Sequence, residues 1–137
     1  MRVVWAALTS VFVCALLTGG AAAQKRGGDP EAAKIENPVA ASKTSITAGS
    51  RAYARNCRQC HGVRGRGDGP LAPNNPRPAD LTDGTWEFGT SDGELFALIW
   101  NGVPDDPDTE MKGMKDTLAE RDVWSIINYL RTLGPGN

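Results

Sequence analysis

The regular spacing of apolar residues predicts a helix near the end of the chain. Thr117 and Glu120 have the spacing of a capping box at its start, and Gly134 followed by Pro135 ends the pattern. Between these signals the apolar side chains recur at the 3.6-residue period of an amphipathic helix. The stripe consists of Val123, Ile126, Ile127, Leu130 and Leu133.

A second helix is predicted in the stretch "SDGELFALIWNG" at residues 91–102. Ser91 and Glu94 form another capping box, apolar residues follow them directly, and Gly102 is a typical residue after the end of a helix. The apolar residues that follow the box are Leu95, Phe96, Leu98 and Ile99.

The stretch "TAGSRAYARNCRQC" at residues 47–60 predicts a third helix. Gly49 and Tyr53 lie four residues apart on one side of it. A glycine inside a helix costs up to ~1 kcal/mol against alanine, so Gly49 indicates close contact with another helix. Because no strand pattern of comparable strength is present, we predict an all-α domain of about three to four main helices.

Two segments precede this domain. Residues 1–23 combine Arg2, the apolar run "VVWAALTSVFVCALL" and small residues, the pattern of a secretory signal peptide. Residues 24–46 contain Gly-Gly, two prolines and scattered charge, which indicates a flexible leader. The expected domains are therefore a signal at 1–23, a leader at 24–46 and a helical domain at 47–137.

The chain has three cysteines and one histidine. Cys14 lies in the signal, so the exported chain keeps only Cys57 and Cys60, followed directly by His61. A disulfide framework needs more pairs, a structural zinc site needs about four ligands, and a thioredoxin-like thiol pair needs flanking strands. C-x-x-C-H in an exported protein is the attachment pattern of a c-type haem.

The spacing of this motif suits a haem. On a helix, residues three and four positions apart lie on one face, so both sulfurs can reach one porphyrin while His61 points at the iron. The domain has fewer than 100 residues, a size at which apolar burial alone is marginal. A covalently held macrocycle would supply the missing interior.

The sixth position of the iron needs a separate argument, because the chain has no second histidine. The sixth ligand could be a methionine or a lysine, or the protein could leave this position open. After the signal, the methionines are Met111 and Met114, in a polar stretch about fifty residues past His61. We expect one of the two to be the axial ligand.

The sequence resembles a single-haem class I cytochrome c of the small bacterial branch. The likeness covers roughly residues 48–133 and rests on "CRQCHGVRGRGDGPLA", "PRPADL", "SDGELFALIWNGVP" and "MKGMKDTLAERDVWSIINYLRTL". The resemblance implies a small cytochrome c fold packed around one covalently bound haem c. It also implies thioether bonds to Cys57 and Cys60, with His61 as an axial ligand.

The resemblance assigns further residues by position. The family's methionine ligand precedes a leucine by seven positions, and Leu118 makes that residue Met111, with Met114 as the alternative. The carbonyl of Pro70 is implied as the acceptor for the second ring N–H of the histidine. Residues that resemble the crossing of the first and last helices are Gly49, Tyr53 and Tyr129.

Charge is divided sharply along the chain. Residues 51–77 contain six arginines and one acid, whereas residues 80–110 contain nine acids and no lysine or arginine. The acids directly before Met111 predict a docking loop for a partner with a cationic patch, although a merely solvated surface is equally consistent. These acids are Asp105, Asp106, Asp108 and Glu110.

These features predict an electron carrier rather than an enzyme. An iron with two protein ligands has no open position for a substrate, so we expect one-electron exchange between a dehydrogenase or quinol-oxidising complex and a terminal acceptor. The alternatives are a haem-bearing electron-entry subunit of one enzyme complex and a haem protein with an open sixth site. We expect export to the periplasm, no membrane span after signal cleavage and no nucleic-acid partner.

Overall fold

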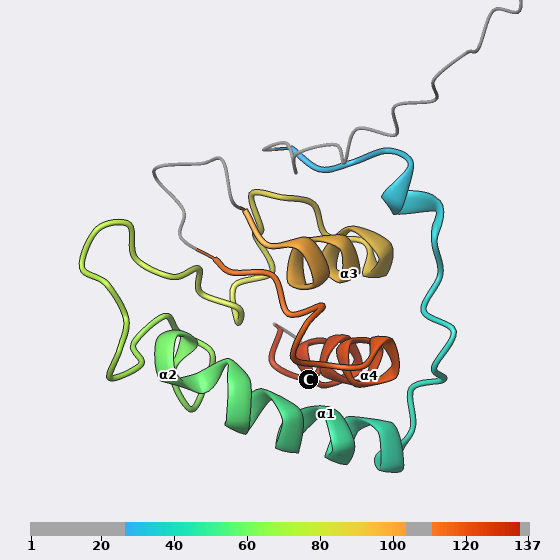
Figure 1. The fold of residues 1–137 in the computed structure, drawn as a ribbon, viewed down its shortest axis with the longest axis horizontal. Coiled ribbons are helices and arrows are strands. Elements are labelled where there is room, and N and C mark those ends of the chain that lie inside the picture. Colours follow the sequence, from blue (N-terminus) through green and yellow to red (C-terminus); the bar gives the residue numbers. More distant parts are fainter. Residues whose placement is uncertain (1–26, 104–110, 135–137) are drawn as a thin grey trace, which may run out of the picture.

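The computed structural model describes residues 27–103 and 111–134 (Figure 1). In these ranges the secondary structure is helical, apart from an isolated antiparallel bridge between Gly102 and Lys112. The prediction of a small all-α fold is confirmed. The elements are the 3-10 turn η1 (Ala32–Lys34) and the helices α1 (Lys43–Asn56), α2 (Arg58–His61), α3 (Asp92–Asn101) and α4 (Glu120–Leu130).

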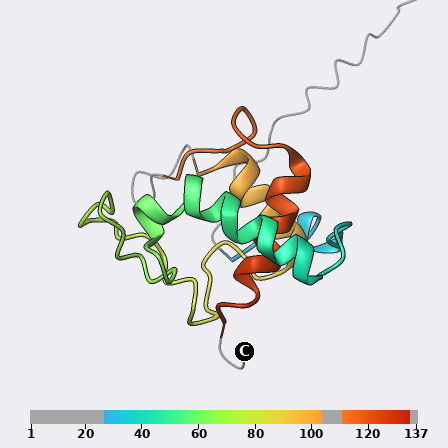
Figure 2. The same cartoon turned by 90° about the horizontal axis from the view of Figure 1, so that it is seen from below.

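Helix α1 lies across α4, as two perpendicular views show (Figures 1 and 2). A Cβ added at Gly49 would lie 1.9 Å from the backbone oxygen of Ser125, so only a glycine permits this approach. Further along the two helices, the rings of Tyr53 and Tyr129 meet with centroids 5.3 Å apart. The residues expected at a crossing of the first and last helices therefore lie at the contact between α1 and α4.

The core lies between α1, α3 and α4. Four members of the α4 stripe are buried, and Leu133 packs against them from the edge. The aromatic rings of Trp100, Phe96 and Trp124 stack in that order, with Phe96 and Trp124 only 4.1 Å apart. The buried cluster consists of Ala52, Tyr53, Leu95, Ile99, Val123, Trp124, Ile126, Ile127 and Leu130.

The helix starts differ in how well the sequence predicted them. The capping box of α3 is present, since Ser91 accepts from the backbone of Glu94 and Glu94 accepts from Ser91. In α4 the N-cap is Ala119 and no side chain caps it, so the predicted box at Thr117 is wrong. The backbone N–H of Thr117 instead closes a turn onto the carbonyl of Met114, 2.9 Å away, and Thr117 lies two residues before the N-cap of α4.

Residues 27–42, here called the N-terminal strap, differ from the expected flexible leader. The strap runs along the side of the domain opposite to α2 (Figure 1) and joins α1 at Lys43, four residues before the expected start at residue 47. Its contacts come from single polar and small side chains, which have no period that a sequence pattern could reveal.

Hydrogen bonds tie the strap to both α3 and α4. Asn37 donates to the backbone oxygen of Trp124 (3.1 Å) and to Asn128 (3.0 Å), and Asn128 donates back to the carbonyl of Val39 (2.9 Å). At the other end, the N–H of Asp29 donates to the carboxylate of Glu94, 3.1 Å away. The strap thus fixes α3 and α4 to each other on the outside of the domain.

Residues 1–26 lie outside the described structure, so the secretory signal stays a prediction. Among the helices of residues 27–103 and 111–134, none is both long enough and apolar enough to cross a membrane.

Candidate functional site

The C-x-x-C-H motif forms a separate helical turn at the end of α1. The chain bends at Cys57, which ends α1 and is the N-cap of α2. The carbonyl of Cys57 accepts from the N–H groups of Cys60 (3.1 Å) and His61 (2.9 Å), so the three residues share one tight turn. Both thiols are free and half-buried. The turn therefore presents two sulfurs and one imidazole together.

Burial changes the protonation of these groups. It raises the pKa of the Cys57 thiol to about 11, and the neighbouring Cys60 shifts this pKa in the same direction. Burial also lowers the pKa of His61, against a smaller opposite effect from a hydrogen bond to Ala79. At neutral pH the site therefore holds a Cys57 thiol and a neutral imidazole, the form of histidine that binds metals.

The orientation of His61 depends on a backbone oxygen. Its ring Nδ1 lies 3.4 Å from the carbonyl oxygen of Ala79. When Nδ1 carries the proton and donates to this oxygen, Nε2 is the nitrogen with a free lone pair. The described hydrogen bond is thus made to Ala79, and the role expected for the carbonyl of Pro70 stays a prediction.

The loop after His61 folds back onto the turn through backbone hydrogen bonds. Gly67 donates to the carbonyl of His61 (2.9 Å), Gly69 to that of Cys60 (3.1 Å) and Leu71 to that of Gln59 (2.8 Å). Gly67 has φ of +68°, and a Cβ there would lie 2.1 Å from the carbonyl oxygen of Pro78. A glycine is therefore required where the two arms of this loop meet.

Tyr53 links the turn to the core. Its hydroxyl donates to the carbonyl of Gly62 (2.8 Å) in a buried environment, and burial is the main cause of the raised pKa of this phenol. The hydroxyl therefore stays protonated and continues to donate. Tyr53 joins the α1–α4 contact to the residue directly after His61.

Both candidate methionines are half-buried and pack against the core. The carbonyl of Met111 accepts from the N–H of Val103 (2.8 Å), and the N–H of Met114 donates to the carbonyl of Ile99 (2.9 Å). The methionine segment is thus held by the C-terminal end of α3. This packing suits either residue, and Met111 as the axial ligand stays a prediction.

Trp86 has a buried polar atom that the sequence did not indicate as part of a site. Its indole Nε1 is buried and has no hydrogen-bond partner among the described residues. The guanidinium of Arg131 lies 5.4 Å from the centre of the Trp86 ring and is itself bonded to Asp92 (Nε–Oδ1 2.9 Å). A buried indole N–H normally has an acceptor, so a bound group with a carboxylate would fit here. The available signal was a tryptophan in a polar, glycine-containing loop, outside any helical stripe.

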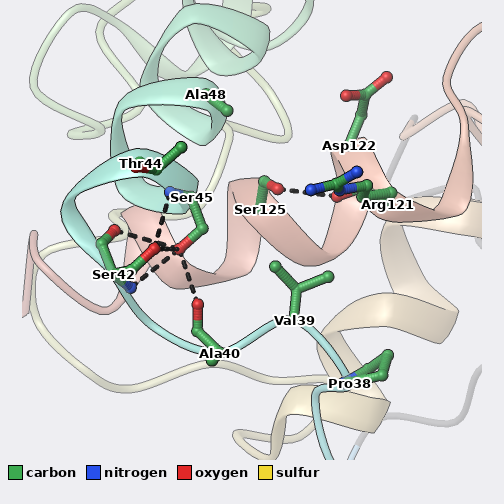
Figure 3. Close-up of a pocket in the computed structure, with 10 residues that line it drawn as sticks. All are labelled: Pro38, Val39, Ala40, Ser42, Thr44, Ser45, Ala48, Arg121, Asp122 and Ser125. Atoms are coloured by element: carbon green, nitrogen blue, oxygen red, sulfur yellow. Dashed lines mark hydrogen bonds between the residues drawn. The ribbon is translucent and has the colours of Figure 1, made fainter.

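Two further features are the predicted acidic loop and a groove beside the strap. The four acids of the predicted docking loop lie at residues 104–110, outside the described structure. A groove between the strap and the first turns of α1 and α4 (Figure 3) is lined by residues such as Pro38, Thr44 and Arg121. Its lining includes none of the cysteines, the histidine or the methionines of the candidate site.

Comparison with known proteins defines the class. The family model described as cytochrome c matches residues 46–134. Subunit CcoP of the cbb3-type cytochrome c oxidase of Rhodobacter capsulatus is 32% identical over 100 residues, which are 70% of this chain and 32% of that protein. Cytochrome c550 of Pseudomonas aeruginosa is 30% identical over 97 residues, which are 70% of this chain and 61% of that protein.

Solved structures agree with the fold. A chain of the reducing HAO-like protein complex of Kuenenia stuttgartiensis aligns with a TM-score of 0.63 and 27% identity, covering 73% of this chain and 49% of that one. Cytochrome cL of Methylophaga aminisulfidivorans aligns with a TM-score of 0.55 at 20% identity, covering 79% of this chain and 63% of that one. The second match shows the fold alone.

The chain belongs to the cytochrome c family, as a c-type cytochrome of class I. Its cofactor is one covalently attached haem c. The residues described above fit that group, because two free thiols, a neutral imidazole and an unpaired buried indole N–H are the groups that thioether, iron and carboxylate contacts require. The chain spans about a third of the CcoP relative.

Proposed function

We propose that the protein is an exported one-electron carrier, with its haem attached to Cys57 and Cys60 and ligated by His61 and Met111. The observation that carries the proposal is the turn at residues 57–61, which holds two free thiols and a neutral imidazole on three hydrogen-bonded residues. The packing of the methionine segment against the core supports Met111 as the second iron ligand.

The residues of the candidate site have different roles in this proposal. Cys57 and Cys60 fix the macrocycle to the turn, and the carbonyl of Ala79 holds the ring of His61 so that Nε2 is directed away from it. The buried indole N–H of Trp86 would be free to donate to a carboxylate of the bound group. One-electron exchange between ferrous and ferric iron is the chemistry that the haem supplies when bound.

The proposed iron ligands explain why a carrier is preferred to an enzyme. If His61 and a methionine both held the iron, no position would remain for a substrate or a diatomic gas. Histidine–methionine ligation also raises the reduction potential, which suits a role between a dehydrogenase or quinol-oxidising complex and a terminal acceptor.

A second candidate is an electron-entry subunit bound to one enzyme complex. The observation that favours it is the likeness to CcoP, a subunit of an oxidase, in which the matched region is about a third of the protein. A permanent partner would co-purify in fixed ratio with the full chain, whereas a carrier would be recovered alone.

The test is spectroscopic and uses the full holoprotein. We expect a pyridine-haem spectrum of the c type, haem that stays with the polypeptide in denaturing electrophoresis, and no change on adding carbon monoxide to the ferrous protein. Haem that acid acetone extracts would contradict the thioether bonds. Rapid binding of carbon monoxide would instead favour an open sixth site.

A further inference from the structure

The N-terminal strap contacts the domain at two separate places. Residues 37–39 bond to α4, and these bonds are here called the α4 anchor. Residues 27–35 instead contact the start of α3 and the loop before it, and these contacts are called the α3 anchor. That loop, residues 85–91, carries Trp86 and is called the tryptophan loop. The two anchors therefore hold different parts of the domain.

The carboxylate of Glu94 is the centre of the α3 anchor. It accepts from the N–H of Asp29 on the strap (3.1 Å), and from the N–H groups of Thr90 (3.0 Å) and Ser91 (2.9 Å) at the end of the tryptophan loop. The hydroxyl of Ser91 is a fourth donor, 2.7 Å away. Glu94 is only 9% exposed, and a buried carboxylate is costly unless donors surround it. Its side chain therefore joins the strap to the tryptophan loop.

Two glycines allow the strap to lie close to α3. A Cβ added at Gly93, in the first turn of α3, would lie 1.9 Å from the carbonyl oxygen of Ala32 and 2.8 Å from that of Ile35. A Cβ added at Gly28 would lie 2.1 Å from a carboxylate oxygen of Glu94, and the φ of Gly28 is +94°. A side chain at either glycine would thus force the strap away from α3.

Backbone bonds hold the tryptophan loop on both sides of Trp86. From the strap, the N–H of Gly27 donates to the carbonyl of Glu87, the residue next to Trp86 (2.5 Å). From the end of α4, the guanidinium of Arg131 donates to the carbonyl of Thr90 (2.5 Å) and lies over the Trp86 ring. Thr90 is also one of the donors of the α3 anchor. The position of the Trp86 ring therefore depends on contacts that the strap makes.

The position of this ring matters because its buried indole N–H has no hydrogen-bond partner among the described residues. Such a donor keeps its direction only if the backbone that carries it is fixed. The tryptophan loop contains no helix or strand that could fix it locally. Tertiary contacts must do so, and the α3 anchor supplies them.

We propose that the α3 anchor is a positioning element for Trp86: the docked strap keeps the indole N–H in place to donate to a carboxylate of the haem, and release of residues 27–35 lowers the reduction potential. This inference rests on the proposed function. The N–H offsets part of the negative charge of that carboxylate, which otherwise stabilises ferric over ferrous iron. The strap thereby acts on the iron from the side of the domain opposite to α2.

The first experiment detaches the strap at one anchor or the other without changing net charge. Gly93→Ala and Gly28→Ala each disrupt the α3 anchor, the first from the helix and the second from the strap. Asn37→Ala is the matched control, because it removes bonds of the α4 anchor and leaves the α3 anchor intact. The reduction potential of each full holoprotein is measured by spectroelectrochemical titration. Because Gly28 lies outside every helix, its variant also decides the question if Gly93→Ala does not fold.

We expect both glycine variants to lower the potential and Asn37→Ala to leave it unchanged, although all of them lose stabilising contacts. In a Trp86→Phe background the glycine variants should have little further effect, because the N–H that they displace is already absent. An equal shift in the control would overturn the proposal, since general loosening of the domain would then explain it. A wild-type potential in both glycine variants, or a full shift without Trp86, would overturn it too.

The second experiment follows the indole N–H itself by NMR of the isotope-labelled ferrous holoprotein. Exchange of the Trp86 indole proton with water should be roughly 10-fold faster in Gly93→Ala than in the wild type, the factor expected when about one stabilising hydrogen bond is lost. Asn37→Ala should leave this exchange unchanged. Wild-type exchange in both glycine variants would show that the strap does not hold Trp86. If the wild-type protein has no reversible one-electron couple, the proposed function fails instead, and the exchange rates still decide whether the strap positions the ring.

Discussion

The contact between α1 and α4 depends on a single missing methyl group, and Gly49→Ala tests it. The Cβ of an alanine at residue 49 would lie 1.9 Å from the backbone oxygen of Ser125, 1.5 Å short of the 3.4 Å at which ordinary contact begins. It would also lie 2.5 Å from the backbone carbon of Ser125. Because backbone atoms cannot rotate away as a side chain can, the two helices must separate.

The expected change in the free energy of unfolding of Gly49→Ala follows from two opposing effects. Alanine favours an isolated helix by ~1 kcal/mol over glycine. Overpacking typically costs about 1–3 kcal/mol, and more when the obstacle is rigid. Separation of the two helices also loses much of the dispersion energy between them. We therefore expect a net loss of at least ~2 kcal/mol in the free energy of unfolding, which lowers Tm by about 8–16 °C in a domain of this size.

The assay is thermal and urea unfolding of the full holoprotein, followed by far-UV circular dichroism. The control is Gly134→Ala, where an added Cβ has nothing within 4 Å and no change in Tm is expected. If Gly49→Ala unfolds at or above the wild-type midpoint, the close approach of α1 to α4 is not part of the folded protein.

Three further predictions concern the axial ligand, the acidic loop and pH. Met111→Ala should abolish the weak red absorption band of a methionine–iron bond and lower the potential, and Met114→Ala should keep the band; the reverse result would make Met114 the ligand. Replacing Asp105, Asp106 and Asp108 of the acidic loop by asparagine should slow electron transfer to a cationic partner at low salt, and a wild-type rate would mean that the loop is only a solvated surface. Hydrogen bonds, first from Ser91, lower the pKa of Glu94 below its ordinary 4.5, so its stabilisation exists above that value and is lost as pH falls through the lowered pKa. The stability difference between the wild type and Glu94→Gln should therefore shrink as the pH falls from neutral through the lowered pKa of Glu94, whereas a difference independent of pH would contradict the role of the carboxylate.

The sequence was most informative where one physical rule dominates. The stripe of α4 and the capping box of α3 each follow from local spacing, and both are present in the structure. The close approach at Gly49 was expected because an unfavourable residue in a helix needs a compensating contact.

Other features depend on contacts between distant residues. The cap of α4, the docking of the strap through Asn37 and the carbonyl of Ala79 beside His61 are set by tertiary packing. Backbone oxygens have no sequence identity, so Ala79 could not be found by motif. Trp86 could have been noticed only by its residue type, because its unpaired N–H appears once the fold is formed.

The strap also affects when the chain can complete its fold. Asn37 bonds to residues 87 and 91 positions later in the chain, so this part of the strap has no partner until α4 is present. The same is true of α1, whose glycine faces Ser125. Contacts between residues so far apart in the sequence form slowly, whereas the turn with Cys57 and Cys60 depends on hydrogen bonds between residues three and four positions apart. This turn can therefore form, with both thiols available, before the strap docks on the opposite side of the domain.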